Sequence, residues 1–417
     1  MLIVFLAFGQ SEGDYLNFID CHDDIIEQKI KHAVAEDDCE NCHMANGNAH
    51  PQEGVKGFEL GDEVPALCFM CHDENTKSNI HPPSEEGECL TCHSPHSSAN
   101  KGLLINAPQA ALCFDCHDAS IAEKQFKHKP VAEGNCSNCH DPHQSEYDQL
   151  LKAEKKLLCL SCHTSAQMQM EFSSKHVPFE DDCANCHETH SADHEKLLLQ
   201  KTPELCFNCH DNPVSEEAKS IHKVVTEGTA CANCHNPHAS KEDMLLTKAG
   251  KDLCLSCHSK SIKTEKRTVA NIGQLLKKGN MVHGIIELDG CAVCHNAHAS
   301  EFQALLNSPF PEDTYTAASV ENFELCFMCH DPELMLLEKT TSATNFRNGD
   351  QNMHYLHMNG SKSRNCIMCH NVHGSSSAHL IADKVKFGNW DMPIDYKVND
   401  NGGSCNTGCH AEKKYIR

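Results

Sequence analysis

The sequence is dominated by one repeated motif, Cys-x-x-Cys-His, which occurs thirteen times in 417 residues and once more as Cys-x-x-x-Cys-His. If the 29 Cys and 32 His were placed at random, the motif would occur about 0.2 times. The repetition therefore needs a chemical explanation. The cysteines of the motifs are Cys39 and Cys42, Cys68 and Cys71, Cys89 and Cys92, Cys113 and Cys116, Cys136 and Cys139, Cys159 and Cys162, Cys183 and Cys186, Cys206 and Cys209, Cys231 and Cys234, Cys254 and Cys257, Cys291 and Cys294, Cys326 and Cys329, Cys366 and Cys369, and Cys405 and Cys409.

In such a motif the two thiols can form thioether bonds to one haem, and the His after the second thiol can bind the iron. A disulfide scaffold has no use for a His after every second Cys, and zinc knuckles need four ligands for each ion. The motifs therefore predict fourteen covalently bound c-type haems. The predicted proximal iron ligands are His43, His72, His93, His117, His140, His163, His187, His210, His235, His258, His295, His330, His370 and His410.

Two types of motif alternate along the chain. A first-type motif is followed by a further His, usually three residues after the proximal His, and it is preceded by a lone His seven to nine residues upstream. A second-type motif mostly sits directly behind a Leu, as in Leu-Cys-Phe-Met-Cys-His. The downstream histidines are His50, which departs in its spacing, His96, His143, His190, His238, His298 and His373. The lone upstream histidines are His32, His81, His128, His176, His222, His283 and, by spacing, His357.

The stretch 128–176 shows how two haems can share four histidines. His140 and His143 are three residues apart, so on a helix they share one face, about 4.5 Å apart along the axis. His143 therefore cannot reach the far side of the haem that His140 holds. We expect His143 to bind the iron of the next, second-type haem, opposite His163, and His128 to bind the first haem of the unit, opposite His140. Haems tethered in this way would lie in near contact.

The histidine count matches the predicted haem count. Fourteen irons with two axial ligands each need 28 histidines, and the repeats supply 28 of the 32. The histidines left over are His22, His194, His354 and His379. Every iron can then be six-coordinate, so an electron carrier is favoured over an enzyme. The alternative is a multihaem reductase of a small oxyanion or a metal, with one five-coordinate haem. His410 is the ligand of most interest here, because no later repeat lends its haem a His.

Both ends of the chain depart from the pattern. Residues 17–22, Asn-Phe-Ile-Asp-Cys-His, match a second-type motif except that Phe18 replaces the first Cys. This segment is either a fifteenth haem site, with one thioether at Cys21 and His22 as ligand, or an end repeat that has lost its haem, because terminal repeats are often atypical. At the other end, Gly408 gives the longer Cys-x-x-x-Cys-His loop the freedom to bulge.

The repeat length of about 47 residues and the composition predict the fold class. Only 39% of the residues are hydrophobic and there is one Trp, so protein side chains alone make a thin core. We expect a mostly irregular chain with short α-helices, elongated and built from repeats around a stack of haems. Residues 18–260 hold regular two-haem repeats, and residues 261–417 hold repeats with insertions and the C-terminal Cys-x-x-x-Cys-His unit. The insertion at 260–282 is basic; we expect a solvated helix face there, and a docking patch is the alternative.

Charge and hydropathy limit the partners and the compartment. The formal net charge of −24 argues against nucleic-acid binding. No apolar run approaches the roughly 20 residues of a membrane span. Residues 1–17 begin with a hydrophobic run but lack basic residues, which indicates a short or truncated signal segment. Because c-type haem is attached outside the cytoplasm, we expect an exported protein of the periplasm, the outer membrane or the extracellular space.

With these motifs in view, residues 18–417 resemble the multihaem c-type cytochromes built from doubled Cys-x-x-Cys-His motifs, found in bacteria that respire metals and other extracellular acceptors. The alternation of motif types and the ending Gly-Gly-Ser-Cys-x3-Cys-His-x4-Tyr-x-Arg carry the resemblance. It implies electron transfer in extracellular or outer-membrane anaerobic respiration. The implied partners are other cytochromes or an outer-membrane porin. A further alternative is a subunit of an extracellular filament, in which the terminal haem takes a His from the next protomer.

Overall fold

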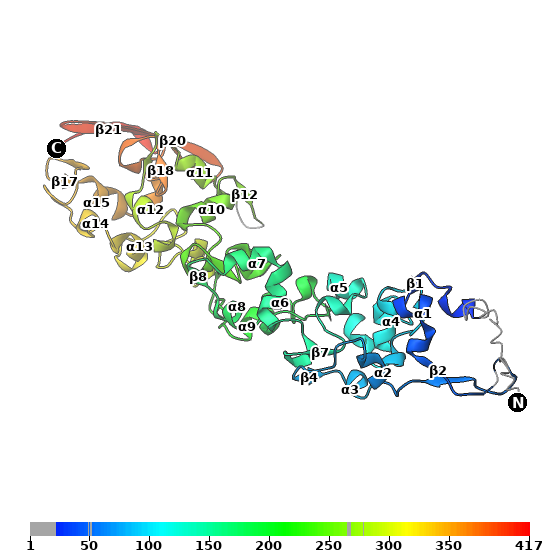
Figure 1. Ribbon diagram of the computed structural model, residues 1–417. Coiled ribbons are helices and arrows are strands. Elements are labelled where there is room, and N and C mark those ends of the chain that lie inside the picture. The colour runs from blue at the N-terminus through cyan, green and yellow to red at the C-terminus, as the bar shows by residue number, and fades with distance from the viewer. Residues whose placement is uncertain (1–21, 49, 51, 265–267, 278) are drawn as a thin grey trace, which may run out of the picture. The chain divides into compact units, whose positions relative to one another are not determined.

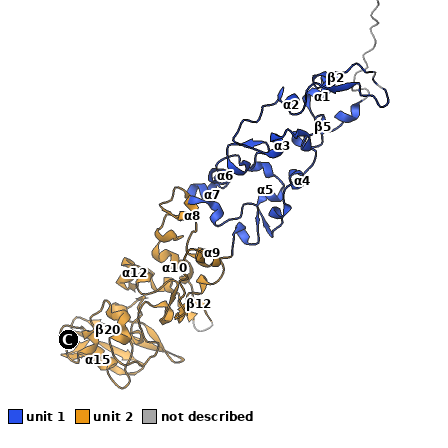
Figure 2. Ribbon diagram, turned by 90° about the horizontal axis from the view of Figure 1, so that it is seen from below, with its two compact units in different colours: residues 1–168, 181–200 blue, residues 169–180, 201–417 orange. Residues whose placement is uncertain are grey.

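The computed structural model describes residues 22–48, 50, 52–264, 268–277 and 279–417 (Figure 1). The chain forms two compact units, coloured separately in Figure 2. Unit 1 comprises residues 1–168 and 181–200, and unit 2 comprises residues 169–180 and 201–417. The predicted signal segment, residues 1–17, lies outside the described residues, as do Phe18 and Cys21.

The same short elements recur along both units (Figure 1). The five repeats between residues 79 and 330 each have a two-residue strand, the lone His, a short helix, the first-type motif on a 3₁₀ turn, a second short strand, another 3₁₀ turn and the second-type motif on an α-helix. The first and last repeats depart from this order. This order confirms the prediction of a repeat-built, mostly irregular chain with short helices. In the labels below, η denotes a 3₁₀ helix.

The motifs lie on single helical turns, which brings two thiols and a His ring together. The backbone N–H of His140 donates to the carbonyl of Cys136 over 3.1 Å, and that of His163 donates to Cys159 over 3.1 Å. The first-type motifs begin on η3 (Cys39–Asn41), η4 (Cys89–Thr91), η7 (Cys136–Asn138), η9 (Cys183–Asn185), η12 (Ala230–Asn233), η14 (Cys291–Val293) and η17 (Cys366–Met368). The second-type motifs lie on α2 (Ala66–Phe69), α4 (Gln109–Phe114), α6 (Lys155–Cys162), α9 (Glu204–Phe207), α10 (Gly250–His258) and α13 (Glu324–Phe327).

A short helix follows the lone His in the first six repeats, whereas the seventh lone His, His357, lies within its helix. In α3, α5 and α12 the lone His is the N-cap and has extended backbone angles. Proline at the start of α3 and α5 suits this position, because the first N–H groups of a helix have no partner within it. These helices are α1 (Ala33–Asp37), α3 (Pro82–Glu85), α5 (Lys129–Ala132), α8 (Val177–Asp181), η11 (Lys223–Val225), α12 (Gly284–Leu288) and α15 (Met353–Met358), which contains His357.

Two-stranded antiparallel sheets connect consecutive repeats. The strand before a lone His pairs with the strand that follows the first-type motif of the next repeat, as in the pair of Ile80 with Gln144. The next residues continue the contact, because the N–H of His81 donates to the carbonyl of His143 over 2.8 Å. The pairs are β1 (Ile30–Lys31) with β5 (Ser97–Ser98), β4 (Asn79–Ile80) with β7 (Gln144–Ser145), β6 (Phe126–Lys127) with β9 (Ser191–Ala192), β8 (Ser174–Lys175) with β11 (Ala239–Ser240), β10 (Ser220–Ile221) with β15 (Ala299–Ser300), and β14 (Met281–Val282) with β18 (Gly374–Ser375).

A left-handed backbone corner follows each of these second strands. Gln149 and Leu150 have φ values of 55° and 54°, and Gly102 takes the same place with a φ of 71°. A positive φ is costly for most residues, so its recurrence indicates that the corner has a structural or functional role. The corners lie on η5 (Lys101–Leu103), η8 (Asp148–Leu150), η10 (Glu195–Leu197), η13 (Asp243–Leu245), η15 (Gln303–Leu305) and η18 (Ala378–Leu380).

A four-stranded antiparallel sheet ends unit 2, and the expectation of helices and loops alone missed it. Its strands, in sheet order, are β19 (Lys384–Phe387), β20 (Trp390–Asn399), β21 (Gly402–Thr407) and β22 (His410–Ile416). Met392 and Ile394 are buried between exposed neighbours and pack on Met368 and Ile381. Cys405 therefore lies on a strand and His410 begins the next one, so the last motif spans a hairpin and not a helix.

The remaining elements lie in the insertions and at the N-terminal end. The basic insertion forms a hairpin and a short helix, so the predicted helix face is wrong for Lys263, which lies on β12; Lys266, Arg267 and Lys278 are outside the described residues. These elements are η2 (Asp23–Ile26), β2 (His43–Ala45), β3 (Phe58–Leu60), η6 (Ala119–Ala122), α7 (Thr164–Gln169), β12 (Ile262–Lys263), β13 (Thr268–Val269), α11 (Ile272–Leu275), η16 (Glu321–Phe323), α14 (Glu333–Leu336), β16 (Arg347–Asn348) and β17 (Gln351–Asn352).

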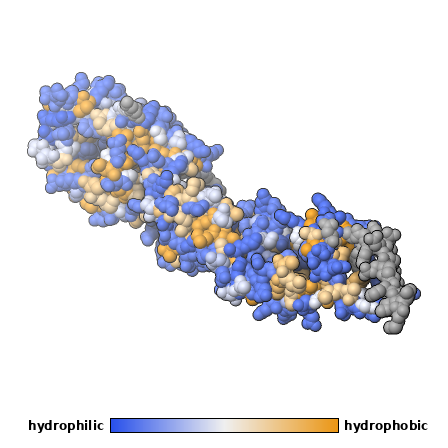
Figure 3. All heavy atoms as spheres, in the orientation of Figure 1, coloured by the Kyte–Doolittle hydropathy of each residue, from blue (hydrophilic) through white to orange (hydrophobic). Residues whose placement is uncertain are grey.

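Buried apolar side chains are few for a chain of this length. Besides the cluster under the C-terminal sheet, Phe323, Met335 and Met358 form a second buried cluster in the described part of unit 2. Figure 3 shows apolar residues scattered over the visible surface among hydrophilic ones. The packing agrees with the thin side-chain core that the composition predicts.

Candidate haem-binding sites

Histidine rings from distant parts of the chain face one another in pairs. The ring centres of His128 and His163 are 5.9 Å apart with 19° between the ring planes, and those of His140 and His190 are 6.1 Å apart with 15°. An imidazole nitrogen binds a metal at about 2 Å, so two imidazoles on opposite sides of one iron have centres roughly 6 Å apart. The pairs therefore have the spacing of two axial ligands.

The same geometry recurs throughout the described part of each unit, with ring centres 5.8 to 6.5 Å apart. In unit 1 the pairs are His22 with His50, His32 with His72, His43 with His96, His81 with His117, His93 with His143, His128 with His163, and His140 with His190. In unit 2 they are His176 with His210, His222 with His258, His235 with His298, His283 with His330, His295 with His373, His354 with His370, and His357 with His410. Each of these pairs lies within one unit; the proximal His187 belongs to unit 1 and the downstream His238 belongs to unit 2.

The pairs follow two rules, and these correct the pairing expected from sequence. A lone His faces the second-type proximal His of its own repeat, as His128 faces His163. A His downstream of a first-type motif faces the first-type proximal His of the preceding repeat, as His143 faces His93. The expected pairs of His143 with His163 and of His128 with His140 are therefore wrong. The strand pair β4–β7 causes the difference, because it draws His143 back to the preceding repeat.

Backbone carbonyls orient the first-type proximal rings. The Nδ1 of His140 lies 2.8 Å from the carbonyl oxygen of Gln149, at the left-handed corner. Because a carbonyl can only accept, Nδ1 must carry the proton, which leaves the Nε2 lone pair for a metal. The other pairs of this kind are His93 with Gly102, His187 with Lys196, His235 with Met244, His295 with Ala304, and His370 with His379.

The lone histidines are oriented in the same way from the next repeat. The Nδ1 of His128 donates to the carbonyl of Thr189 over 3.1 Å, one residue before His190. The corresponding pairs are His32 with Pro95, His176 with Pro237, and His222 with Ala297. Each type of candidate haem site thus has one ring with its tautomer fixed: the proximal His in first-type sites and the lone His in second-type sites.

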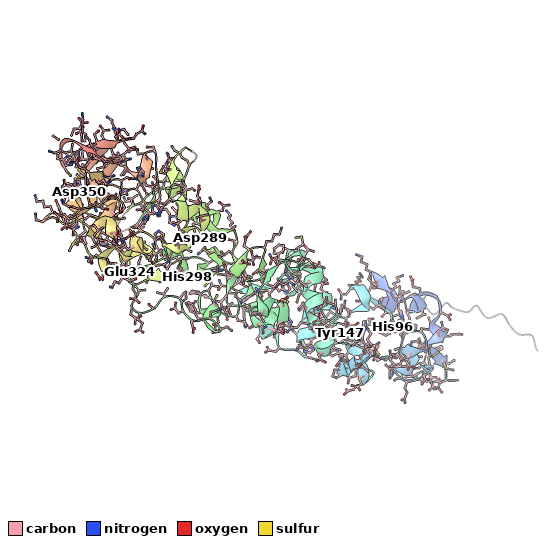
Figure 4. All side chains as sticks on the ribbon, turned by 90° about the vertical axis from the view of Figure 1, so that its left-hand side faces the viewer. His96, Tyr147, Asp289, His298, Glu324 and Asp350 are labelled. Atoms are coloured by element: carbon pink, nitrogen blue, oxygen red, sulfur yellow. The ribbon has the colours of Figure 1, made fainter. Side chains whose placement is uncertain are left out.

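A short turn places the His downstream of a first-type motif. The Asn296 side chain accepts from the backbone N–H of His298, labelled in Figure 4, over 3.0 Å. Asp141 accepts from His143 over 3.1 Å in the same position. Side chains of this type favour such turns, because they bond to the backbone two residues ahead. The Asx residue after the motif therefore contributes to the position of the candidate ligand.

Burial keeps several of the paired rings neutral at pH 7. Burial lowers the pKa of His143, and the nearby His93 lowers it further. Burial lowers the pKa of His373 and of His354 to about 4 in both cases. Neutral imidazole is the form that binds a metal, so these sites do not have to release a proton first.

Motifs that follow one another in the sequence have cysteines that lie close together in the structure. The Cys68 thiol hydrogen-bonds with Cys89, the first cysteine of the next motif, and burial with this neighbour raises the pKa of Cys68. Within a repeat the second cysteines approach, since Cys116 adds to the burial that raises the pKa of Cys92. The first kind of contact recurs for Cys113 with Cys136, Cys159 with Cys183, Cys254 with Cys291, and Cys326 with Cys366. The second kind recurs for Cys139 with Cys162 and Cys234 with Cys257.

The donor set fits c-type haem. Each motif presents two thiols and one imidazole, and in the pairs named above a second imidazole stands at the distance that one iron requires. None of the described motif cysteines forms a disulfide. Comparison with protein families gives the same result: the sequence profile of the doubled CXXCH motif matches residues 32–77, 81–122, 128–168, 176–214, 222–263 and 283–335, more than half of the chain.

The chain belongs to the doubled CXXCH motif family. It is a multihaem c-type cytochrome, and its general function is electron transfer. Each of the six matched stretches begins at a lone His and runs past the second-type motif of the same repeat. A comparison with curated proteins found no match. Among the described residues, no helix is both long enough and apolar enough to cross a membrane.

Sequence reasoning missed one member of the histidine pairs in this cytochrome and left a second one open. No later repeat supplies a His for His370, and His354, which the histidine count left over, faces it at a ring distance of 6.5 Å. His410, singled out because no later repeat lends its haem a His, is faced by His357. The two histidines three residues apart on α15 were the available signal. The member left open is His22, which faces His50.

Proposed function

We propose that this cytochrome holds fourteen c-type haems, one on each motif, and carries electrons along them between redox proteins outside the cytoplasm. The observation that carries the proposal is the order of the motif cysteines. In unit 1 each motif approaches the next from Cys42 to Cys183, through contacts such as Cys42 with Cys68 and Cys139 with Cys162. In unit 2 the same order runs from Cys234 to Cys405.

Bound c-type haem supplies one-electron chemistry, and the residues of this chain determine how it is held. Two thiols would hold the haem, and in most of the sites a fixed Nδ1 proton leaves the Nε2 lone pair of one ring for the iron. The two paired rings would both bind the iron, which would leave no position for a substrate in these sites. This arrangement supports an electron carrier over a reductase of a small oxyanion or a metal.

The proposed setting is anaerobic respiration in the periplasm, at the outer membrane or in the extracellular space. The support is chemical, since c-type haem is attached outside the cytoplasm. The net charge of −24 favours partners with basic surfaces, because opposite charges accelerate the encounter of two redox proteins. Suitable partners are other cytochromes or the cytochrome-binding surface of an outer-membrane porin. Association of several copies into a filament is the second arrangement compatible with this function.

The haem count and the spin state test the proposal. The full chain is produced with a c-type haem maturation system, and haems are counted by intact mass under denaturing conditions and by the pyridine haemochrome. We expect at least fourteen haems and low-spin iron throughout. A count of twelve or fewer contradicts the proposal. A stoichiometric high-spin fraction that binds carbon monoxide in the intact protein supports the reductase instead.

Deletion of one haem tests the linear order. In the variant Cys113→Ala with Cys116→Ala, the fourth motif loses its attachment while the motifs on both sides remain. We expect the current through single molecules held between electrodes to fall strongly, because an electron must then cross the gap of a missing carrier. Replacing the exposed His379 by Ala is the control, since Ala304 occupies the equivalent corner with the same φ of 54°. An unchanged current in the deletion variant contradicts a single path.

A further inference from the structure

We propose that unit 1 contains a fifteenth haem site, with His22 and His50 as its axial ligands and Cys21 as its single point of attachment. The proposal deepens the proposed function, because it rests on the same use of paired histidines. Neither residue belongs to a complete Cys-x-x-Cys-His motif. Phe18 stands where the first Cys before His22 would be, and His50 is the downstream His of the Cys39 motif.

The geometry of this pair matches that of the pairs at complete motifs. The ring centres of His22 and His50 are 5.9 Å apart, with 21° between the planes. The corresponding values for His81 and His117 are 5.9 Å and 16°. A surface histidine has no reason to face another at the spacing of two axial ligands. The pair therefore has the geometry of a site.

The chain after His22 has the anchoring of a second-type haem site. The hydroxyl of Ser97 donates to the carbonyl of Ile25 over 2.7 Å, and the N–H of Gln28 donates to the Ser97 hydroxyl over 3.4 Å. Ile25 and Gln28 stand seven and four residues before the lone His32.

The same bonds recur two repeats later. The hydroxyl of Ser191 donates to the carbonyl of Ile121 over 2.6 Å, and the N–H of Lys124 donates to Ser191 over 3.3 Å. Ile121 and Lys124 stand seven and four residues before the lone His128, and the chain leads to them from the proximal His117. His22 therefore occupies the structural position of a second-type proximal His. The sequence alone left this open.

His50 lies between β2 and β3 in the sequence. Near these strands, the side chains of Asn46 and Asn48 both donate to the carbonyl of Lys56, over 3.0 and 3.1 Å. The ring of Phe58 meets the His50 ring edge-on at 5.4 Å. A Cβ at Gly57 would lie 2.5 Å from the His50 Cβ, so only glycine allows this close approach. The longer spacing from His43 thus places the ring of His50 at His22.

Attachment through one cysteine is chemically complete. Cys21 lies outside the described residues, but it directly precedes His22, as the second Cys precedes the His in every complete motif. Its thiol adds across one vinyl group of the haem. One C–S bond forms, the thiol hydrogen goes to the other vinyl carbon, and no electron is gained or lost. The second vinyl group stays intact, because Phe18 has no thiol.

Intact mass under denaturing conditions tests the attachment on the full, haem-loaded chain. We expect fifteen covalent haems in the wild type and fourteen in Cys21→Ala. The other fourteen haems report on folding in the same molecule. Fourteen haems in the wild type, or an unchanged count in Cys21→Ala, overturns the fifteenth site. Fourteen haems with low-spin iron leave the proposed function intact, whereas twelve or fewer haems contradict that function as well.

The spin state tests the ligands separately from the attachment. In His50→Ala we expect fifteen haems still, with one converted from low-spin to high-spin. Gly57→Ala should act in the same direction by displacing the His50 ring, and Gly284→Ala is its matched control, because a Cβ at Gly284 meets nothing within 4 Å. His194→Ala, at a histidine that belongs to none of the pairs named above, is the control for loss of a histidine. A low-spin spectrum in His50→Ala that equals the wild-type spectrum overturns the assignment of His50.

Discussion

His143 shows how a single residue connects two repeats. Its ring faces His93 of the preceding repeat, while its carbonyl accepts from the N–H of His81, the lone His of that same repeat. The residue therefore completes one candidate haem site and holds the backbone of another. Its own motif gains nothing from its ring, since His190 faces His140.

We expect His143→Ala to convert one haem to high-spin, namely the haem attached at Cys89 and Cys92. Two double variants identify it, because substitutions at one iron are not independent. His93→Ala with His143→Ala should disturb one iron, whereas His143→Ala with His163→Ala should disturb two. The number of disturbed irons is measured by electron paramagnetic resonance with spin quantitation. One disturbed iron in the second combination would restore the pairing expected from sequence.

The buried histidines of unit 2 predict a loss of stability in acid. Burial lowers the pKa of His354 and of His373 to about 4, below the usual value of about 6.5. Between these values the unfolded chain binds protons that the folded chain does not, so the free energy of unfolding decreases as the pH falls from about 6.5 to about 4.

Denaturant unfolding at several pH values measures this effect. In His354→Gln the dependence of the unfolding free energy on pH between 7 and 4 should be shallower than in the wild type. His379→Gln changes an exposed ring and should leave the slope unchanged. Equal slopes in His354→Gln and the wild type would show that His354 does not resist protonation in the folded protein.

At the scale of residues, the sequence predicts which histidines take part better than it predicts their partners. Spacing singled out His128 and His143, and both face another ring. Their partners depend on which strands pair, and two-residue strands such as β4 carry too little pattern to predict. His354 was missed because the end of a repeat array has no following repeat to complete it.

At the scale of elements, the left-handed corner acts as the hydrogen-bond acceptor of the proximal ring. Gln149 has a φ of 55°, and its carbonyl lies 2.8 Å from the Nδ1 of His140. An ordinary residue in this region costs about 1 kcal/mol, and a β-branched residue costs more. The same corner in other repeats holds Gly102 or Ala304, so the carbonyl and not the side chain is what the site uses.

We expect Gln149→Gly to be nearly neutral and Gln149→Val to lower the free energy of unfolding by about 1–2 kcal/mol. The Val variant should also weaken the hydrogen bond to His140. A proximal ring with a weaker Nδ1 hydrogen bond is less basic and stabilises oxidised iron less, so the midpoint potential of that haem should rise. Urea titration and spectroelectrochemistry measure the two effects. Identical potentials in the Gly and Val variants would contradict a role for the corner.

The C-terminal sheet follows from a local alternation of apolar and polar residues that the haem-motif repeat does not describe. In β20 the residues alternate between buried and exposed from Asp391 to Asp395, with Met392 and Ile394 inward. This period of two indicates a strand, but the segment was treated as an insertion between haem motifs. The short helices at the motifs were predictable, because each Cys-x-x-Cys-His must bring its His back toward the first Cys. The sheet obeys ordinary core packing, which the repeat pattern does not describe.

At the scale of the whole molecule, repetition made the fold class predictable. Repeats that cannot bury a core alone must stack on their neighbours, and here each repeat adds a strand to the one before it. What repetition could not predict is how the array ends. At the N-terminal end His50 faces His22, and at the C-terminal end His354 faces His370. Both pairs depend on local residues that do not follow the repeat pattern.

The net charge of −24 determines how the whole molecule exchanges electrons with small reagents. Fourteen haems would add two carboxylates each, so the negative potential strengthens when they are bound. A cationic reagent is attracted and an anionic one repelled, and salt screens both effects, since the Debye length falls from about 30 Å at 0.01 M to about 10 Å at 0.1 M. Added salt should therefore slow exchange with the cation and accelerate exchange with the anion.

Stopped-flow oxidation of the reduced protein over this range measures the effect, with hexaammineruthenium(III) as the cationic reagent and ferricyanide as the anionic one. We expect opposite slopes, with rate changes on the order of tenfold in each direction. A neutral quinone is the control and should show a nearly flat dependence. Reversed slopes, with salt accelerating exchange with the cation and slowing exchange with the anion, would mean that electrons leave at a locally basic site, such as the insertion that carries Lys260 and Lys263, and that the net charge does not control the exchange.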